Sequence, residues 1–554
     1  MDLTYCEKLV LKWNKLIYNF AKMTQNDKTC SITAVLGIIL GVLGTVLVYS
    51  LFPSKKLDGN YAGWRKLNLI LEQVQENYVD SVDIRKVTDA AVTASLAALD
   101  PHSVYLPPVE LEKSESDLAG NFDGIGIQFN VPNDTAIVLE VIPGGPSEKV
   151  GLQAGDRLLK VGDKNIAGVK FPQDSMVRRM KGPAGTEVNI LVKRGRETIP
   201  FNIKRGKIPV HCVDASFMIN DTTGYIRLSK FSMNTYKEVS AAAQTLLDKG
   251  MTYLIFDLRD NSGGYLEQAL MLSDMFLKKG DEIVYLKGLH RKREDYKADG
   301  KGILKDVALS VLVNESSASS SEIFAGAIQD NDRGTIIGRR SYGKGLVQES
   351  KFFTDGSGIR LTIARFYTPS GRCIQKPYSD DYQYDIYKRY ADGEMFDRDS
   401  IKVDSTEIYY TVGGRPVYGG GGIVPDVFVP MDTTAATKYF VRCNKKATQM
   451  RFASAIFDKY GKVLGSIDNY AELDAFLDNL GIPAKFKEYA ASVDGIIPST
   501  GEWEKTAPYM IPQLRALVGR YSKLGDNAFY RIYLQIDDVV KTALRPESAI
   551  VIER

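Results

Sequence analysis

The feature that most constrains this chain is an unbroken apolar run near its N-terminus. No charged residue occurs between Lys28 and Lys55, and Ile32–Phe52 is almost continuously hydrophobic. A helix of these 21 residues, at about 1.5 Å each, would span about 31 Å, the thickness of a bilayer core. The run is also longer than the roughly 7–15 apolar residues of an ordinary signal peptide. We therefore predict a transmembrane signal anchor over residues 31–52.

The charges around this run indicate an orientation. Five lysines precede it and four basic residues follow it closely: Lys8, Lys12, Lys15, Lys22 and Lys28, then Lys55, Lys56, Arg65 and Lys66. Basic residues favour the cytoplasmic side of a membrane. We expect residues 1–30 to be cytoplasmic, with the body of this single-pass protein on the extracytoplasmic (periplasmic) side of the inner membrane. The sequence does not indicate whether the anchor is cleaved.

Length and composition narrow the class of the remaining chain. At 554 residues the chain exceeds the roughly 250–300 residues of a single hydrophobic core, so several domains are expected. It is 44% hydrophobic and 25% charged, which is typical of globular protein rather than disordered chain. Lys and Arg total 71 against 68 Asp and Glu, so nothing in the charge favours a nucleic acid partner. Five scattered cysteines form no CxxC pair and predict no disulfide framework.

The periodicity of apolar residues changes along the chain and predicts four further regions. Residues 64–110 have helical spacing, and residues 115–206 alternate short strands with turns, as in a small β-rich domain. Residues 210–430 alternate strands with helices, which predicts an α/β core around a covered sheet. Within that core, residues 346–353 and 359–367 predict a β-hairpin around DGSG. Residues 431–554 predict a helical C-terminal domain without a catalytic motif.

Several common catalytic and binding motifs are missing. The chain has three histidines, His102, His211 and His290, and neither GxSxG nor HExxH, so the sequence predicts no metal site or cofactor. We interpret His102, in a turn after Asp100-Pro101, as structural. Residues 338–345 nearly match a phosphate-binding loop, but Gly345 replaces the required Ser or Thr and the next residues predict a strand.

The candidate catalytic residues are concentrated between residues 314 and 348. Ser319 and Glu322 match the S-x-x-E capping box, so Ser319 is either a helix cap or a nucleophile placed near backbone amides. A serine nucleophile needs a base, and in the absence of a suitable histidine a lysine is the remaining candidate. Lys344 lies between two glycines. It could act as a base only if burial lowered its pKa well below the ordinary lysine value of about 10.4.

Taken together, these motifs resemble the carboxy-terminal processing (tail-specific) serine peptidases over residues 64 to 430. Ser317-Ala-Ser-Ser-Ser-Glu322 and Gly343-Lys-Gly-Leu-Val-Gln348 match the family's SASASE and GKGxVQ patterns. Lys344 follows Ser319 by 25 residues and Gln348 follows Lys344 by four, as in the family. Ser320 replaces the family's usual alanine. The resemblance implies that Ser319 is the nucleophile, Lys344 its base and Gln348 the residue that orients the lysine.

Other segments agree with this resemblance. Asp257–Gly264 is similar to the family's DLRxNxGG loop, which implies that the amides of Ser320 and Gly263 form the oxyanion hole; which glycine donates stays open. Segments 99–106, 365–372 and 422–426 resemble three more family motifs. Residues 122–127 are similar to a PDZ carboxylate-binding loop, which implies that Ile125, Gly126 and Ile127 bind a peptide's C-terminal carboxylate.

The resemblance implies a crotonase/ClpP-like protease core with an inserted PDZ domain. The implied partners are proteins or peptides with free C-terminal tails, and the implied reaction is acyl transfer without a cofactor. A catalytically silent PDZ scaffold at the membrane and a nucleotide-dependent machine are the alternatives. Substrate preference, the effect of the PDZ domain on activity, and whether the chain forms a homo-oligomer are not indicated by the sequence.

Overall fold

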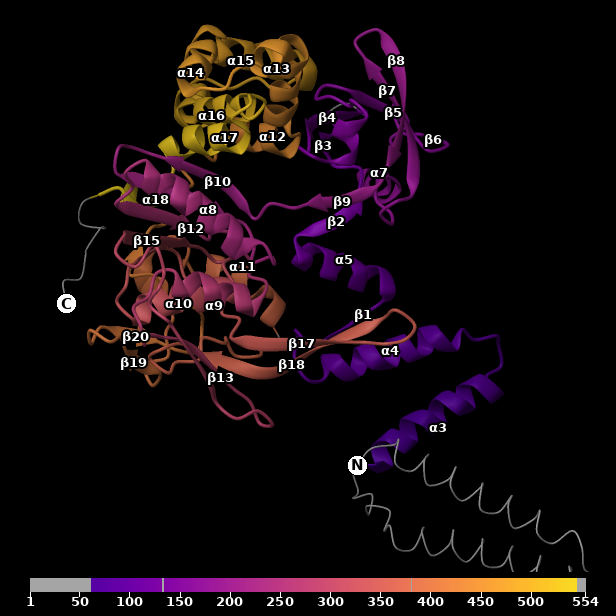
Figure 1. Ribbon diagram of the computed structural model, residues 1–554, viewed down its shortest axis with the longest axis vertical. Coiled ribbons are helices and arrows are strands. Elements are labelled where there is room, and N and C mark those ends of the chain that lie inside the picture. The colour runs from indigo at the N-terminus through magenta and orange to yellow at the C-terminus, as the bar shows by residue number, and fades with distance from the viewer. Residues whose placement is uncertain (1–60, 132–133, 380, 546–554) are drawn as a thin grey trace, which may run out of the picture. The chain divides into compact units, whose positions relative to one another are not determined.

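The computed structural model describes residues 61–131, 134–379 and 381–545 (Figure 1). Among these residues, none of the helices combines the length and the hydrophobicity of a membrane span. The predicted cytoplasmic segment 1–30 and anchor 31–52 lie outside the described residues. The chain divides into two units, Met1–Val92 and Thr93–Arg554. The described part of the first unit contains α3 (Tyr61–Asn77) and the start of α4 (Ile84–Ala97), where the apolar spacing predicts helices.

In the second unit, a small β-rich domain follows α5 (Pro108–Ala119). Its stem is the antiparallel pair β2 (Asn121–Gly124) and β9 (Gly206–Pro209). Its sheet has the order β3-β4-β5-β7-β8, with β6 beside β5. The bounds are β3 Ile127–Asn130, β4 Ala136–Val141, β5 Arg157–Val161, β6 Lys164–Asn165, β7 Glu187–Arg194 and β8 Glu197–Lys204, with helices α6 Pro146–Lys149 and α7 Gln173–Met180. Its hydrophobic core includes Val138, Leu158 and Met176. Among the described residues β3 pairs only with β4, so β3 lies at the edge of this sheet.

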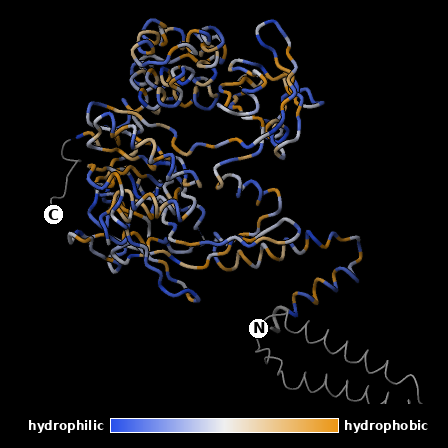
Figure 2. Tube along the Cα trace, viewed as in Figure 1, coloured by the Kyte–Doolittle hydropathy of each residue, from blue (hydrophilic) through white to orange (hydrophobic). Residues whose placement is uncertain are grey.

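The α/β core is built on a six-stranded sheet of order β10-β11-β12-β15-β16-β21. Strands β11 to β21 run parallel, and β10 is antiparallel to β11. The bounds are β10 Val213–Met218, β11 Thr223–Leu228, β12 Tyr253–Asp257, β15 Ala308–Val313, β16 Thr335–Gly338 and β21 Val427–Phe428. Its strands are apolar on both faces, as expected for a covered parallel sheet, and hydrophobic stretches coincide with these strands in Figure 2.

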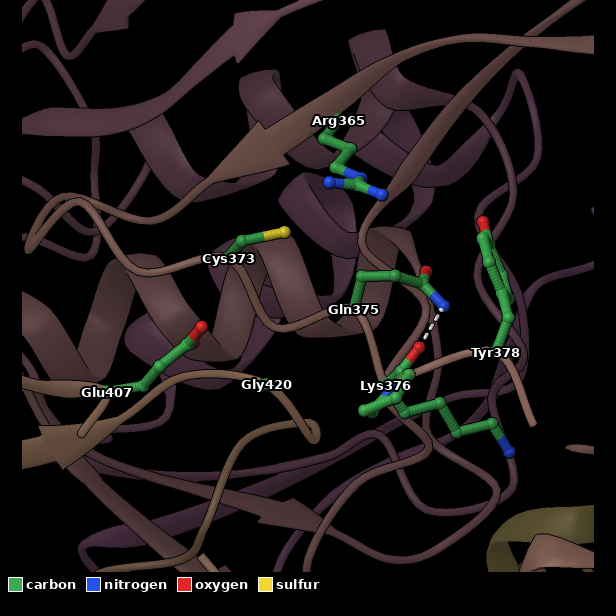
Figure 3. Close-up of a pocket in the computed structure, with 8 residues that line it drawn as sticks. Arg365, Cys373, Gln375, Lys376, Tyr378, Glu407 and Gly420 are labelled. Carbon is green, nitrogen blue, oxygen red and sulfur yellow. Dashed lines mark hydrogen bonds between the residues drawn. The ribbon is translucent and has the colours of Figure 1, made fainter. Parts of the chain in front are cut away.

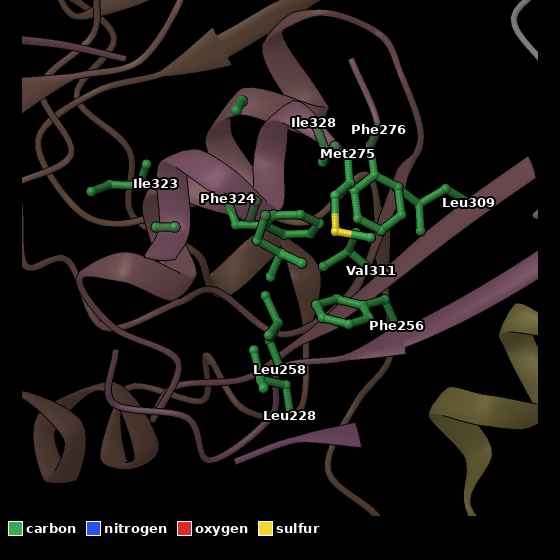
Figure 4. Packing of buried hydrophobic residues seen from close by; sticks show 14 of the residues in the cluster. Leu228, Phe256, Leu258, Met275, Phe276, Leu309, Val311, Ile323, Phe324 and Ile328 are labelled. Carbon is green, nitrogen blue, oxygen red and sulfur yellow. The ribbon is translucent and has the colours of Figure 1, made fainter. Parts of the chain in front are cut away.

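Three helices cover one face of this sheet: α8 (Thr235–Asp248), α9 (Leu266–Asp274) and α10 (Ser320–Asp330). Phe256 of β12, Phe276 and Phe324 of α10 meet there with ring centroids 5.2–6.1 Å apart (Figure 4). Every residue of α10 is buried. The start of α10 is therefore held by packing along the whole helix, which matters because Ser319 immediately precedes it.

The opposite face is covered by the last helices of the described chain, α17 (Gly525–Tyr533), η3 (Leu534–Ile536) and α18 (Asp538–Ala543). Leu534, Val539 and Val540 pack against sheet residues such as Ile255 and Leu312. The end of the region predicted as a separate helical domain thus contributes to the core of the α/β sheet. The helices before it, with their own core, are α12 Lys438–Lys445, α13 Thr448–Leu464, α14 Tyr470–Asn479, α15 Ile482–Asp494 and α16 Glu502–Gly519.

A second sheet has the order β1-β18-β13-β14, with β17 also paired to β18. The bounds are β1 Val104–Leu106, β13 Glu282–Lys287, β14 Glu294–Lys297, β17 Leu346–Phe352 and β18 Gly358–Tyr367. Antiparallel pairing of β17 with β18 confirms the predicted hairpin around DGSG. Between β18 and β21 the chain forms η1 (Tyr382–Tyr384), α11 (Asp385–Ala391), η2 (Arg398–Ser400), β19 (Ile408–Tyr410) and β20 (Pro416–Tyr418).

Candidate active site

Ser319 lies in a strained turn between β15 and α10. Its φ of 54° and ψ of −112° are unusual for a residue with a side chain. The turn contacts Gly263, where an added β-carbon would lie 2.9 Å from both Ser319 Cβ and the Ser320 nitrogen. Only glycine allows this approach, and its φ of 96° is also one that glycine adopts readily. The predicted nucleophile and the predicted oxyanion residue are therefore in direct contact.

Serine hydroxyls connect the nucleophile turn (residues 314–321) to the glycine loop (residues 258–265). Ser317 Oγ donates to the Leu258 carbonyl at 2.8 Å, and Ser321 Oγ donates to the Asn261 carbonyl at 2.9 Å. Ser320, the departure from the family pattern, donates through Oγ to the Gly264 carbonyl at 2.9 Å. Its extra hydroxyl thus adds another connection between these segments.

The two predicted oxyanion amides differ in their partners. The backbone amide of Ser320 donates no hydrogen bond to any described residue, so it is free to bind an oxyanion. The amide of Gly263 donates to Asn261 Oδ1 at 2.9 Å. In this conformation the Gly263 amide is not available to an oxyanion, because its single hydrogen is already engaged. The neighbouring Gly264 amide has no partner in the described part of the chain.

Lys344 lies in the lysine loop (residues 339–345) between β16 and β17. Burial lowers the pKa of its ammonium, and Arg360 lowers that pKa further, whereas Glu322 and Asp100 raise it. Lys344 Nζ donates to Gln348 Oε1 at 3.0 Å, which joins two predicted site residues. A buried lysine with a lowered pKa can lose its proton and act as a base.

The nucleophile turn and the lysine loop meet at a third residue. The amides of Ser319 and Lys344 donate to the same oxygen, Glu322 Oε2, at 2.8 and 2.9 Å. The backbones of the two predicted catalytic residues therefore lie next to each other. Over the described residues, no hydrogen bond joins Ser319 Oγ to Lys344 Nζ. Such contacts are often long in an enzyme without substrate.

A ring of hydrogen bonds holds Gln348. A register shift between Val347 and Gln348 interrupts the β17–β18 ladder, and such irregularities redirect side chains. Gln348 Nε2 donates to the His102 carbonyl at 2.6 Å, and His102 Nε2 lies 2.7 Å from the Tyr382 hydroxyl. Gln375 closes the ring by donating to Tyr382 Oη at 3.1 Å and accepting from the Gly345 amide at 2.9 Å.

The surroundings of His102 agree with its interpretation as a structural residue. Asp100 Oδ1 accepts from the amides of His102 and Ser103, at 2.7 and 2.8 Å, which fixes the turn. Burial lowers the pKa of His102 to about 4, so the ring is neutral at pH 7. Neither the role of the His102 carbonyl nor that of Tyr382, which is 280 residues away, could be predicted from a local pattern.

A small cavity lies next to Gln375, whose side chain accepts from the Gly345 amide of the lysine loop. It has a volume of about 150 Å³ and is lined by Arg365, Cys373, Gln375, Lys376, Pro377, Tyr378, Glu407 and Gly420 (Figure 3). Gln375 Nε2 also donates to the Lys376 carbonyl at 2.9 Å. Because small-molecule sites usually exceed roughly 300 Å³, this cavity does not suit an organic cofactor.

The predicted carboxylate-binding loop of the β-rich domain has amides without partners. Ile125 is buried, and its carbonyl accepts from the Ser147 amide and hydroxyl, at 3.0 and 2.7 Å. The amides of Ile125 and Gly126 donate to no described residue. Ile127 begins the edge strand β3. This arrangement leaves donors for a carboxylate next to a strand edge that can accept a peptide.

Two alternative sites do not match the described structure. After β16 ends at Gly338, the near-match to a phosphate-binding loop continues into strand β17, so no helix N-terminus faces the loop. Across residues 61–131, 134–379 and 381–545, no group of three or more His, Cys, Asp and Glu side chains could hold a metal ion.

Comparison with known proteins places these features in a family. Residues 222–386 match the model for peptidase family S41, and residues 124–204 match that for a PDZ domain. The chain is 32% identical to the carboxy-terminal processing protease CtpA of Bacillus subtilis over 59% of this chain and 70% of that protein. It is 35% identical to a carboxy-terminal-processing protease of Bartonella bacilliformis, over 62% of this chain and 79% of that one.

One similar solved structure is also that of a C-terminal processing protease. The photosystem II D1 C-terminal processing protease is 27% identical, with a TM-score of 0.36 over 66% of this chain and 86% of that one. The identity and coverage of the Bacillus and Bartonella sequences decide the assignment. The chain belongs to peptidase family S41, the carboxy-terminal processing proteases, and carries a PDZ domain.

Proposed function

We propose that this serine peptidase cleaves polypeptides near their C-termini with a Ser319–Lys344 dyad. The observation that carries the proposal is the half-buried Lys344, whose pKa is lowered and whose Nζ is held by Gln348, in a loop that shares Glu322 Oε2 with Ser319. Neutral Lys344 takes the proton from Ser319 Oγ, which attacks the scissile carbonyl. The amides of Ser320 and Gly264, which have no partner among the described residues, stabilise the oxyanion. Lys344 then protonates the leaving amine, and water releases the acyl-enzyme.

Substitution of each dyad residue tests this assignment. Ser319→Ala and Lys344→Ala should each lower turnover of an unstructured peptide at least about a thousand-fold, because neither partner works alone. The matched controls are Ser316→Ala, in the nucleophile turn, and Lys351→Ala, on strand β17 after the lysine loop, which both change exposed residues. Near wild-type turnover by either dyad variant, with its fold intact, would show that the assignment is wrong.

The PDZ domain is proposed to bind the substrate's C-terminal tail. The free amides of Ile125 and Gly126 would hold the terminal carboxylate, while the peptide extends along β3 from Ile127. A tail peptide with a free carboxylate should therefore bind more tightly than the same peptide with an amidated end. Equal affinity of the two peptides would contradict this role.

We also propose that residues 31–52 anchor the protein in the inner membrane, with its crotonase/ClpP-like catalytic body outside the cytoplasm. The support is the 21-residue apolar run and the lysines before it. The protein should remain in the membrane fraction after carbonate washing, and external protease should digest the body in spheroplasts. Release by carbonate, or complete protection of the body, would contradict this topology.

A further inference from the structure

Glu322 receives hydrogen bonds from both sides of the active site. Its Oε2 accepts from the amides of Ser319 and Lys344, at 2.8 and 2.9 Å. Its Oε1 accepts from the Gly343 amide at 2.7 Å and from the Ser341 hydroxyl at 2.5 Å. The side chain is fully buried, so bulk water does not replace these partners.

This arrangement exceeds what a helix cap requires. In a capping box the glutamate accepts from the amide of the cap residue, here Ser319. Three further donors come from residues 341–344, across the active site. Ser341 is itself fixed, because its Oγ accepts from the Ile423 amide at 2.7 Å and so directs its own hydrogen toward Glu322.

The bonding pattern defines the chemical form of the side chain. All four partners donate, so both oxygens must act only as acceptors. An ionised carboxylate does this, whereas a protonated acid or an amide presents at least one hydrogen to a donor. Burial raises the pKa of Glu322, while the hydrogen bonds from Ser341, Lys344, Gly343 and Ser319 lower it and favour the ionised form. Charge-assisted hydrogen bonds of this kind are also stronger than neutral ones.

We propose that Glu322 is a positioning residue whose ionised carboxylate holds the nucleophile turn and the lysine loop at a fixed separation. This inference rests on the proposed roles of Ser319 and Lys344. It adds that the dyad is assembled through one buried anion, and that the distance between nucleophile and base depends on that anion rather than on β17 alone.

The charge of Glu322 should affect the pH dependence of kcat through the pKa of Lys344. Glu322 and Asp100 raise the pKa of Lys344, while Arg360 lowers it, and His102 is neutral. Removing the charge of Glu322 therefore lowers the pKa of Lys344. The acid limb of the kcat profile should then move to lower pH. A residue that only fills space would leave that limb unchanged.

Glu322→Gln is the decisive variant because glutamine has nearly the same shape. In either orientation its amide group faces at least one of the backbone N–H groups of Ser319, Gly343 and Lys344. We expect kcat to fall about 100-fold, as for an Ångström-scale misplacement, with KM for a short peptide within about threefold of wild type. Hydrogen exchange should accelerate in peptides covering residues 317–323 and 341–346.

Asp248→Asn, which removes an exposed carboxylate from α8, is the control and should change none of these readouts. Folded Glu322→Gln protein with wild-type kcat, pH limb and hydrogen exchange would overturn the inference. If that variant does not fold, Ser341→Ala tests the inference instead, because it removes one hydrogen-bond donor to the Glu322 carboxylate. A several-fold lower kcat supports the inference and an unchanged kcat overturns it. Loss of turnover in Ser319→Ala alongside a normal Glu322→Gln would reject this inference and leave the proposed function standing.

Discussion

At Ser319 the backbone departs from the conformations that serine prefers, and the surrounding contacts explain how this is maintained. Its φ of 54° would cost of order 1–3 kcal/mol in isolation. The hydrogen bonds of Ser317, Ser320 and Ser321 to the glycine loop offset that cost. The strain places the hydroxyl at the start of α10 and leaves the next amide free.

The pH dependence of catalysis should report the environment of Lys344. Only the neutral amine accepts a proton, so kcat should rise with pH and level off above the pKa of Lys344, which burial and Arg360 hold below the ordinary value of about 10.4. Arg360→Gln removes a positive charge, which raises this pKa and should move the acid limb to higher pH. Lys351→Gln, an exposed cation on β17, should leave the limb in place. A limb unaffected by Arg360→Gln would contradict Lys344 as the titrating base.

At the residue scale, the sequence predicted which residues form the active site. It did not predict all of the hydrogen bonds that hold them together. The spacing of Ser319, Lys344 and Gln348 identified the group, and the Lys344–Gln348 hydrogen bond was expected. The occupied amide of Gly263 was not, because the conformation of the Asn261 side chain leaves no trace in local periodicity. The pattern of Ser319 and Glu322 predicted a cap but could not reveal donors from the lysine loop.

Among the elements, the segment between β18 and α11 contributes to the active site through Tyr382. Tyr382→Phe removes the hydroxyl that meets both His102 and Gln375 while keeping the ring. We expect kcat to fall roughly three- to tenfold with KM nearly unchanged, since Gln348 loses part of its support. Stability should fall by about 1–2 kcal/mol in chemical denaturation.

Tyr384→Phe is the matched control, since Tyr384 is 64% exposed in the same segment. It should alter neither kcat nor stability. If Tyr382→Phe lowered stability but left kcat unchanged, the ring of hydrogen bonds would serve folding alone.

The PDZ loop offers a prediction with an internal control. At Gly126 φ is 77°, and an added β-carbon would lie 3.0 Å from Ile208 Cδ1. Gly126→Ala should weaken binding of a free-carboxylate tail peptide at least about tenfold in a fluorescence polarisation titration, because the donor amides move. Gly162→Ala introduces similar strain, at a φ of 62° with no neighbour within 4 Å, in another turn of the domain. If both variants weakened tail binding equally, the loop would not be the carboxylate site.

Helices and strands with a strong local sequence pattern could be predicted. Strands β17 and β18 are adjacent in the chain and joined by residues 353–357, so their pairing needs no distant information. The Tyr- and Asp-rich stretch from residue 377 to 410 could not be assigned, because its short helical turns depend on contacts with the active-site loops.

At the scale of the whole molecule, the last helices pack on the sheet far from the dyad. A substitution in this packing should lower the free energy of unfolding. Leu534 is 7% exposed and lies in the core on the second face of the sheet. Leu534→Ala should lower the free energy of unfolding by about 2–4 kcal/mol, because it leaves a cavity in that core. Leu544→Ala, at a side chain that is 38% exposed, should cost under about 1 kcal/mol. Equal effects in urea denaturation would contradict a structural role for this packing.

This packing also shows why the sequence could not define the core completely. The apolar spacing of residues 431–554 predicts helices, but a helix with one apolar face does not specify which surface it covers. In the structure Val539 and Val540 cover a sheet whose first strands lie more than 300 residues earlier in the chain.

The position of α18 has a consequence for synthesis. Residues 538–543 complete the second face of the sheet, so that face stays uncovered until nearly all of the described chain has left the ribosome. The nucleophile turn, the glycine loop and the lysine loop are made long before then, but the sheet that supports them lacks part of its core. A peptidase built in this order cannot complete its catalytic body while the nascent chain is still short.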